Sequence, residues 1–600
     1  MHVSEPRLAA LSAQLISLGV DLYLQPMGDE FQGEYTPDCA ARLPFLTGFT
    51  GSAGLGVFWA QAHGARRHTL FVDGRYTLQA AQQAGPRMAV LHSGEVTLAQ
   101  WLEQQADKAL VVGFDPWLMT QAQVEHLQQA TAHLSIRWQA LEKNPVDAVW
   151  VERPAAPEGA VELQPLELAG ASYEQKRSAL LERIGQQGAD GLILALPDGI
   201  NWLLNIRGSD IPFNPLLLSY FALNRHGIAT LFTYERTFGQ QVDNYLAEQG
   251  VAVASIAALW SGKKSIGAAG ESWLIDAGTA ASGFFALAEK NGVALKRIED
   301  PTLLPKACKN QVELDGVRAA HGRDGVALSR LLCWLDGRVR GGNFPDELEV
   351  VEKLEGYRRQ SNLYRQPSFA TISGSGPHGA IVHYRADEAS NRRLKKGDIF
   401  LLDSGGQYPD GTTDVTRTVT IGEPTTQMKE HYTRVLKGHI ALAAARFPAG
   451  TSGQQLDALA RQFLWAAGLD YDHGTGHGVG AYLCVHEGPQ RIAKKGSSVA
   501  LVPGMIVSNE PGFYLEGKYG IRIENLVAVV KLGATAQGKD MLGFETLTLA
   551  PIDTRLVEVS LLTVDERNWL NDYHRRVHKA LSPSMDAVEL RWLDEATRAI

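Results

Sequence analysis

Two aspartates flank apolar strand patterns in the C-terminal half of the chain. Residues 399–402 form an uninterrupted apolar run that predicts a buried strand, and Asp403 follows it directly. Asp414 precedes the alternating segment 415–419, and a turn signal at 408–411 lies between the two aspartates. A hairpin would bring both carboxylates to one place. Burying them costs free energy unless a cation meets them, and taken alone the pair is more typical of turn chemistry than of a metal site.

Three further segments add side chains that could ligate a metal ion. His473 and His477 lie in a stretch too rich in glycine to form a helix. Glu510 ends a strand pattern and is followed by proline. Arg522 and Glu524 alternate within another strand pattern, which predicts that both side chains lie on the same face. Apolar residues follow Glu524, so this carboxylate stands where a buried side chain is expected.

Four carboxylates and one imidazole then converge. They belong to Asp403, Asp414, His477, Glu510 and Glu524. So many negative charges cannot be buried together without a divalent cation. Hard oxygen donors with a single nitrogen favour Mn(II) or a similar ion over a structural zinc site.

Two other motifs around these histidines are rejected. The segment 476–481 fits the GxGxxA form of a dinucleotide-binding fingerprint, but no apolar strand precedes it. His473 and His477 are spaced as in a zincin, yet Gly474 stands where that motif has its glutamate. The segment therefore predicts neither a nucleotide site nor a zincin helix.

The N-terminal half contains a weak internal repeat. A helix pattern ended by Gly19 leads into a strand pattern at 20–24, and a capping box at Ser172 and Gln175 opens a helix that leads into a similar strand pattern at 189–194. Further along each copy, Thr-Leu-Phe occurs at 69–71 and again at 230–232. The repeat predicts two α/β domains of like topology. Chance similarity of helix, glycine and strand units is the alternative.

Proline-rich stretches suggest the domain boundaries. One covers residues 152–162, and Pro301 and Pro305 bracket another short segment. Long helices are expected at about 311–338 and at 564–581. We expect a first α/β domain at 1–155, a second of similar topology at 160–303, a catalytic domain at 306–540 and a C-terminal helical extension at 541–600.

The composition is that of an ordinary globular protein, with 45% hydrophobic residues and a net charge of −9. No block of like charge indicates a nucleic-acid or membrane partner. The first residues lack the apolar run of a signal peptide, and no apolar run is long enough to span a bilayer. Four scattered cysteines without a CxxC motif are expected to be reduced thiols. A cytoplasmic location is the expectation.

Six ordered motifs resemble the creatinase and aminopeptidase superfamily and, within it, the three-domain, cytosolic-type aminopeptidase P group. They lie at residues 402–408, 410–418, 473–480, 485–489, 508–514 and 520–525. With two N-terminal domains and a similar tail, the resemblance covers essentially the whole chain. It implies an α/β (α+β) protein in which two creatinase-like α/β domains precede a pita-bread metallopeptidase domain.

The resemblance implies a metallo-exopeptidase that releases the N-terminal residue of peptides with proline in second position. Two divalent metal ions, expected to be Mn(II), would activate water. Asp403 would bind one ion, His477 and Glu510 the other, and Asp414 and Glu524 would bridge both. Shared carboxylates suit two ions close together, because they offset the repulsion between them.

The resemblance also implies roles around the ligands. Glu510 would be the general base. His383, His473 and His486 would orient the peptide and stabilise the tetrahedral intermediate. Arg522 would anchor a neighbouring carboxylate, although a purely structural ion pair is the alternative. Arg385 is unusual for its place in the motif, and a homodimer is the family expectation.

Other activities remain as alternatives at this point. A prolidase would cleave only Xaa-Pro dipeptides and would need a group that binds the proline carboxylate. A methionine aminopeptidase would not carry two such N-terminal domains. A catalytically silent binding module and a metal-free creatinase-like hydrolase are opposed by the ligating residue types at all five expected positions.

Overall fold

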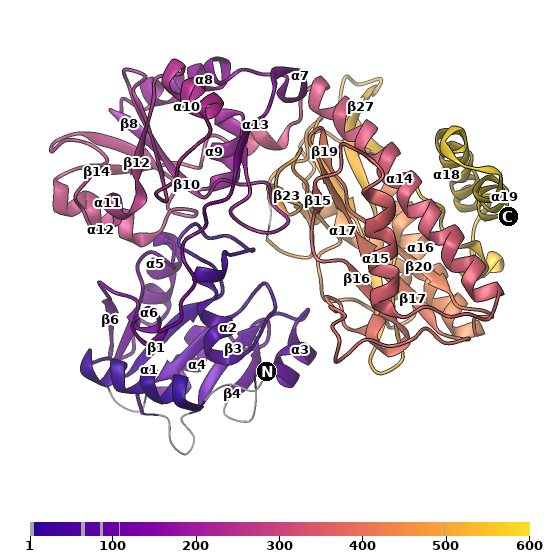
Figure 1. Ribbon diagram of the computed structural model, residues 1–600, viewed down its shortest axis with the longest axis horizontal. Helices are drawn as coiled ribbons and strands as arrows, with labels where there is room; N and C mark the ends of the chain where they lie inside the picture. The colour runs from indigo at the N-terminus through magenta and orange to yellow at the C-terminus, as the bar shows by residue number, and fades with distance from the viewer. Residues whose placement is uncertain (1–4, 62–66, 85–87, 107–108, 497) are drawn as a thin grey trace. The chain divides into compact units, whose positions relative to one another are not determined.

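The computed structural model describes residues 5–61, 67–84, 88–106, 109–496 and 498–600. Its contacts divide the chain into two compact units, the first comprising Met1–Gln164 with Ala171–Thr302, and the second Pro165–Gly170 with Leu303–Ile600. The first unit is coloured from indigo to magenta in Figure 1, and the second extends to yellow. The first four residues of the expected 1–155 domain lie outside the described residues.

The first unit contains two six-stranded sheets with corresponding strand orders, β4-β3-β2-β1-β5-β6 and β12-β11-β10-β8-β13-β14. In each, the second and third strands of the list pair antiparallel, as do the third and fourth, and all other neighbours are parallel. The weak sequence repeat is therefore a repeat of topology. The strands are β1 (Leu22–Pro26), β2 (Leu55–Trp59), β3 (His68–Val72), β4 (Met88–His92), β5 (Leu110–Phe114), β6 (Ile136–Ala140), β8 (Gly191–Leu194), β10 (Ser219–Asn224), β11 (Ala229–Thr233), β12 (Val251–Ser255), β13 (Ser272–Ile275) and β14 (Ala294–Arg297).

Two helices of this unit confirm the sequence predictions closely. In α1 (Glu5–Ser17) the buried side chains recur at helical spacing, and Gly19 follows with φ 65°, a conformation that glycine adopts without steric cost. In α8 (Tyr173–Gln186) the capping box of Ser172 and Gln175 is formed. The remaining elements are α2 (Arg42–Thr47), α3 (Thr77–Gln83), α4 (Leu98–Gln105), α5 (Gln121–Ala130), α6 (Pro145–Val149), α9 (Pro197–Leu204), α10 (Gln240–Glu248), α11 (Ile256–Trp260), α12 (Ser282–Asn291), η1 (Asp38–Ala40) and the paired strands β7 (Val161–Leu163) and β9 (Ile206–Gly208).

The second unit is built on antiparallel sheets. A three-stranded sheet has the order β16-β17-β20, and a six-stranded sheet has the order β21-β28-β27-β24-β22-β23. These strands are β16 (Ile372–Ser375), β17 (Ile399–Ser404), β20 (Val415–Thr420), β21 (Phe447–Pro448), β22 (Gly476–Gly478), β23 (Glu487–Ile492), β24 (Ile506–Asn509), β27 (Asn525–Ala534) and β28 (Asp540–Thr546). Smaller sheets are formed by β15 (Gln366–Pro367), β18 (Gly406–Tyr408) and β19 (Gly411–Thr412), and by β25 (Gly512–Leu515) with β26 (Tyr519–Arg522).

Helices of the second unit pack against these sheets. The longest is α14, which matches the predicted start and extends two residues past the predicted end, and α18 has the predicted bounds. No helix of the described residues is apolar over a length that would cross a membrane. The helices are α7 (Leu166–Ala169), α13 (Leu303–Ala307), α14 (Gln311–Arg340), α15 (Glu347–Arg358), α16 (Thr426–Ala443), α17 (Gly453–Trp465), α18 (Val564–Leu581) and α19 (Ala587–Ala596), with short helices η2 (Gly376–Ala380), η3 (Thr554–Leu556), η4 (Val559–Leu561) and η5 (Ser582–Ser584).

Asp403 lies at the end of β17, one residue before the last, as predicted. One detail of the strands differs from the sequence predictions. Arg522 and Glu524 do not share one strand, because β26 ends at Arg522 and β27 begins at Asn525. At this point the backbone N–H of Glu524 donates to the carbonyl of Thr416 at 3.2 Å. The chain changes sheets here, which the apolar alternation does not reveal. All four cysteines are free, as expected.

A buried ion triad joins α13 to β23. The carboxylate of Glu487 contacts the ammonium of Lys306 at 2.8 Å and that of Lys309, and all three side chains are at most 1% exposed. Removing one partner from such a site leaves buried charge uncompensated, which costs far more than the loss of a surface ion pair.

We predict that Glu487→Gln lowers the free energy of unfolding by about 3–5 kcal/mol, because two buried ammonium groups lose their carboxylate. The half-exposed pair of Arg318 and Glu545 supplies the control, and Glu545→Gln should cost less than about 1 kcal/mol. Urea unfolding followed by circular dichroism compares the two variants. Equal shifts of the unfolding midpoint would show that the triad does not stabilise the unit.

Candidate metal centre

Strand pairing brings the five predicted ligand residues towards one place. Strands β17 and β20 are antiparallel neighbours, with Asp403 opposite Thr416. In the six-stranded sheet, β24 pairs with both β22 and β27. Asp403 lies in β17, Asp414 directly before β20, His477 in β22, Glu510 directly after β24, and Glu524 between β26 and β27.

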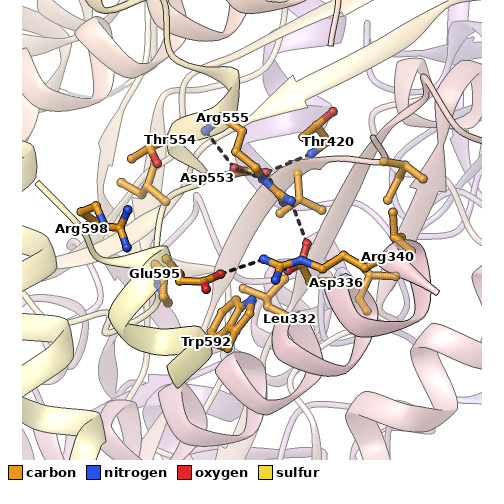
Figure 2. Close-up of a pocket in the computed structure, with 17 residues that line it drawn as sticks. Leu332, Asp336, Arg340, Thr420, Asp553, Thr554, Arg555, Trp592, Glu595 and Arg598 are labelled. Atoms are coloured by element: carbon orange, nitrogen blue, oxygen red, sulfur yellow. Dashed lines mark hydrogen bonds and ion pairs between the residues drawn. The ribbon is translucent and has the colours of Figure 1, made fainter. Parts of the chain in front are cut away.

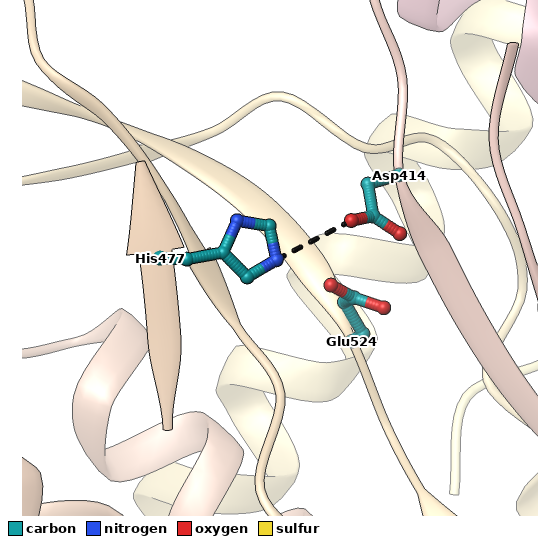
Figure 3. Close-up of side chains that lie close together, drawn as sticks. All are labelled: Asp414, His477 and Glu524. Atoms are coloured by element: carbon teal, nitrogen blue, oxygen red, sulfur yellow. Dashed lines mark ion pairs between the residues drawn. The ribbon is translucent and has the colours of Figure 1, made fainter. Parts of the chain in front are cut away.

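Three of these side chains form a compact cluster. Ligand atoms of Asp414, His477 and Glu524 all lie within 4.8 Å of one another (Figure 3). The Nε2 atom of His477 is 3.5 Å from Asp414 Oδ2 and 3.5 Å from Glu510 Oε1. The imidazole therefore faces carboxylates that adjoin two different strands, an arrangement in which a cation can be shared.

The two carboxylate oxygens of Asp403, the next predicted ligand, have different surroundings. Its Oδ2 accepts a hydrogen bond from Arg522 Nη2 at 2.6 Å. Its Oδ1 is buried and has no hydrogen-bond partner among the described residues. A buried carboxylate oxygen without a partner costs free energy, so this atom fits a metal ligand.

The acidity of these groups shows how crowded the negative charges are. Burial raises the pKa of Asp403 to about 7, and the charges of Asp414 and Glu510 add to it while Arg522 opposes the rise. Burial, with the charges of Asp414 and Asp403, also raises the pKa of Glu524 well above its ordinary value. Without a cation in addition to Arg522, the carboxylates therefore retain protons that a divalent cation would displace.

The pKa of His477 reflects the same excess of negative charge. Burial lowers the pKa of an imidazole, but the neighbouring carboxylates of Asp414 and Glu510 outweigh burial and raise the pKa of His477 to about 9. Its Nδ1 lies 2.9 Å from the carbonyl oxygen of Gly478. Because a carbonyl only accepts, this contact leaves Nε2 facing the carboxylates in the orientation of a metal ligand.

A hydrogen-bond chain links Arg522 to His473. Arg522 Nη1 donates to the Tyr514 hydroxyl at 2.6 Å, and that oxygen lies 2.8 Å from His473 Nε2. His473 Nδ1 lies 2.8 Å from the carbonyl oxygen of Gly474, so Nδ1 carries the proton and Nε2 accepts from Tyr514. His473 Nδ1 is also 3.9 Å from Glu510 Oε2. Tyr514 was not among the predicted site residues, although it lies in the motif that contains Glu510.

Two hydroxyl groups that sequence reasoning missed hold the carboxylates. Thr416 Oγ1 donates to Glu524 Oε2 at 2.8 Å and accepts from Arg522 Nε at 3.1 Å. Ser508 Oγ donates to Glu510 Oε1 at 3.1 Å. Strand alternation was the available signal, because Thr416 is two residues from Asp414 and Ser508 two from Glu510.

The remaining predicted residues differ in their contact with the site and in their burial. The His486 ring contacts the His477 ring edge to face, with centroids 4.3 Å apart. His383 is half-buried in the loop between η2 and β17, and Arg385 beside it is exposed. The contact with His477 brings His486 to the site, whereas the roles of His383 and Arg385 stay predictions.

A cavity of about 310 Å³ lies elsewhere in the second unit, between α14, β20, the 551–555 segment and α19. Figure 2 shows that its charged side chains face one another. Arg555 pairs with Asp336 and Asp553, and Arg340 pairs with Asp336 and Glu595. None of the predicted site residues lines it. This cavity is therefore not the place where the predicted ligand residues gather.

Comparisons with known proteins agree with this geometry. Residues 7–137 and 152–313 match the Creatinase/Prolidase N-terminal domain, residues 315–531 match Metallopeptidase family M24, and residues 540–600 match the C-terminal region of peptidase M24. A probable Xaa-Pro aminopeptidase P of Ajellomyces capsulatus is 38% identical over 99% of both chains. One from Aspergillus niger is 39% identical over 99% of this chain and 98% of its own. This chain belongs to the Xaa-Pro aminopeptidase P family.

A solved structure supports the same assignment. The X-prolyl aminopeptidase of Caenorhabditis elegans, described as a cytosolic enzyme with a di-nuclear active site, is 34% identical with a TM-score of 0.92 over 99% of each chain. The fold class predicted from the motifs is confirmed: creatinase-like α/β domains precede a pita-bread metallopeptidase domain. The chain is a metallopeptidase of this family.

We predict that Tyr514→Phe lowers kcat for peptide hydrolysis ~10-fold or more, because Arg522 and His473 lose the hydroxyl that joins them. At saturating Mn(II) the bound metal content should stay unchanged, since all five proposed ligands remain. Tyr519→Phe is the matched control on the same hairpin, where the hydroxyl contacts His431 at 3.0 Å. Steady-state kinetics and metal analysis test both variants, and equal kcat values for the two would contradict this role for Tyr514.

Proposed function

We propose that this protein hydrolyses the Xaa-Pro bond at the N-terminus of peptides and releases the first residue in a metal-dependent reaction. The observation that carries the proposal is the convergence of Asp414, His477 and Glu524 within 4.8 Å, with Glu510 in contact with His477. These residue types form a metallopeptidase centre in a chain of the Xaa-Pro aminopeptidase P family.

We propose that two divalent ions bind at this centre and that they are Mn(II). The donors are carboxylates with a single imidazole, which suits Mn(II) better than zinc. The Caenorhabditis elegans relative is described as having a di-nuclear active site. Asp403 is the proposed ligand of one ion and His477 and Glu510 of the other, while Asp414 and Glu524 would be shared by both.

The ions, when bound, supply a water of lowered pKa and polarise the scissile carbonyl. Glu510 is the proposed general base, which holds the proton of the attacking water and delivers it to the leaving proline nitrogen. His383, His473 and His486 are proposed to orient the peptide and to stabilise the tetrahedral intermediate. Arg522 holds Asp403 Oδ2 at 2.6 Å, which fixes that carboxylate.

Proline explains why such a peptidase is specialised. Its nitrogen carries no hydrogen in the peptide, and its ring fixes φ. A pocket that relies on the missing donor therefore does not process the bond. The free α-amino group of the substrate is proposed to contact the carboxylates of the site, which accounts for cleavage from the end of the peptide.

A tripeptide and a dipeptide separate the proposed activity from that of a prolidase. Metal-stripped protein is incubated with Xaa-Pro-Yaa or Xaa-Pro, with and without Mn(II), and the products are identified by mass spectrometry. We expect Mn(II)-dependent release of the first residue from the tripeptide, with the dipeptide largely intact. Preference for the dipeptide would indicate a prolidase, and no release from either would indicate a binding role instead.

We predict that Glu510→Ala lowers turnover by ~10²–10⁴-fold or more, because both a general base and a ligand are lost. Circular dichroism should show an intact fold. Glu516→Ala, at an exposed position in the turn of the β25–β26 hairpin, is the matched control and should keep full activity. Full peptidase activity of the Glu510 variant would refute the proposed mechanism.

We further propose a cytoplasmic homodimer without nucleic-acid or membrane partners. Its location is supported by the relative described as a cytosolic enzyme and by four free cysteines. The dimer and the domain bounds at 1–155, 160–303, 306–540 and 541–600 stay predictions from the sequence. Sedimentation at micromolar concentration tests the dimer, and a monomer alone would exclude it.

A further inference from the structure

The C-terminal segment that follows β28 reaches the strand beside the metal centre. Arg417 lies in β20, three residues after Asp414, and its side chain is 1% exposed. Tyr573 comes from α18, and its hydroxyl accepts from Arg417 Nη2 at 2.8 Å. The same hydroxyl lies 2.8 Å from the carbonyl oxygen of Ala550 and 3.3 Å from its backbone nitrogen. Tyr573 therefore joins α18 to β20 and to the chain that follows β28.

Arg417 uses its remaining donors on the backbone near Glu524. Its Nη1 donates to the carbonyl oxygens of Glu524 at 2.6 Å and Thr416 at 2.8 Å. Its Nη2 donates to Asn525 Oδ1 and to the carbonyl oxygen of Ala550, and its Nε to that of Pro551. These acceptors are all neutral, so the guanidinium is held by the geometry of its forked donors instead of by a carboxylate partner.

A second branch runs from Asn525 towards Glu510. Asn525 Nδ2 lies 3.1 Å from His439 Nε2, and His439 Nδ1 lies 3.1 Å from the carbonyl oxygen of Asn509. Asn509 Nδ2 in turn donates to the carbonyl oxygen of His439 at 2.9 Å. Because a carbonyl oxygen only accepts, His439 donates through Nδ1 and accepts from Asn525 through Nε2. Each of these hydrogen bonds therefore has one donor and one acceptor.

Aromatic contacts from the same helix reinforce this branch. The Trp569 ring stacks on that of Tyr573 at 5.5 Å between centroids, and it meets the His439 ring edge to face at 5.9 Å. Burial and the charge of Arg417 lower the pKa of His439 to about 3. The imidazole is therefore neutral at any ordinary pH, as the hydrogen-bond pattern requires.

We propose that the C-terminal segment positions Glu524 and Glu510 through Tyr573, Arg417, Asn525 and His439. Asn525 directly follows Glu524 and Asn509 directly precedes Glu510, and the two asparagines face each other across β24 and β27. The network thus fixes the backbone on which each carboxylate sits. The inference rests on the proposed function, because it takes Glu510 and Glu524 as metal ligands. These four residues are positioning residues, since none contacts the ions or the substrate in the proposed mechanism.

The test removes one hydroxyl from α18. Tyr573→Phe keeps the ring and its stacking but takes away one of the three acceptors of Arg417 Nη2. We expect the dissociation constant for Mn(II) to rise ~10-fold, as for other residues that orient metal ligands indirectly, and kcat to fall while KM changes little. Mn(II) affinity of the metal-stripped protein is measured by titration calorimetry, independently of activity.

Tyr432→Phe is the matched control. Tyr432 is fully buried in the same hydrophobic cluster as Tyr573, and its hydroxyl makes no hydrogen bond to Arg417. This variant should bind Mn(II) within ~2-fold of the wild type, although it too removes a buried hydroxyl. Equal Mn(II) affinities of the two variants would overturn the inference.

A second variant and a stability measurement separate a loss of ligand positioning from a general loss of stability. Arg417→Lys keeps the charge but cannot reproduce the forked donor pattern, so its Mn(II) affinity should fall at least as far as that of Tyr573→Phe. Thermal unfolding of the metal-stripped proteins identifies variants that are simply unstable. If the wild type binds no Mn(II), the proposed function fails. If the wild type binds Mn(II) and cleaves Xaa-Pro-Yaa while Tyr573→Phe binds like Tyr432→Phe, only the inference fails.

Discussion

Buried negative charge is the constraint on which the catalytic unit depends. Four carboxylates lie close together around a single imidazole, that of His477. They belong to Asp403, Asp414, Glu510 and Glu524. The raised pKa values of Asp403 and Glu524 show that these carboxylates do not ionise together without additional positive charge. Divalent ions would relieve this repulsion, so the proposed function joins metal binding and peptide hydrolysis in one site.

Two buried arginines hold the segments that carry these carboxylates. Arg522 contacts Asp403 directly and is joined to His473 through Tyr514. Arg417 holds the backbone of Glu524 and receives the Tyr573 hydroxyl from α18. Neither guanidinium can substitute for a divalent ion, because neither can be shared by all the carboxylates. In the proposed function, both hold the proposed ligands in place before an ion binds, which would lower the reorganisation that binding requires.

Sequence patterns were most informative where structure is local. The capping box at Ser172, the helix that begins at Gln311 and the helix from Val564 to Leu581 all follow from neighbouring residues. The family was indicated by the resemblance of six ordered motifs between residues 402 and 525, and the relatives show it. The repeat was weak in sequence yet clear as two sheets with corresponding strand orders.

Other parts of the site depend on residues far apart in the chain. Thr416 bonds Glu524 across more than a hundred positions, and Arg417 bonds Tyr573 across an even longer separation. No local pattern encodes such contacts. The break between β26 and β27 was also missed, because the apolar alternation continues through the point where Glu524 bonds to β20.

In the proposed function, two metal ions, bridged by shared carboxylates, offset the buried negative charge of the site. Electron paramagnetic resonance of the Mn(II)-loaded protein tests this central claim most directly. Two Mn(II) ions joined by Asp414 and Glu524 should give the broad spectrum of an exchange-coupled pair at full loading. Replacing Asp403 by Ala should remove one ion and leave the signal of an isolated ion. An isolated-ion spectrum from the fully loaded wild-type protein would contradict the account, since the carboxylates would then not bridge two ions.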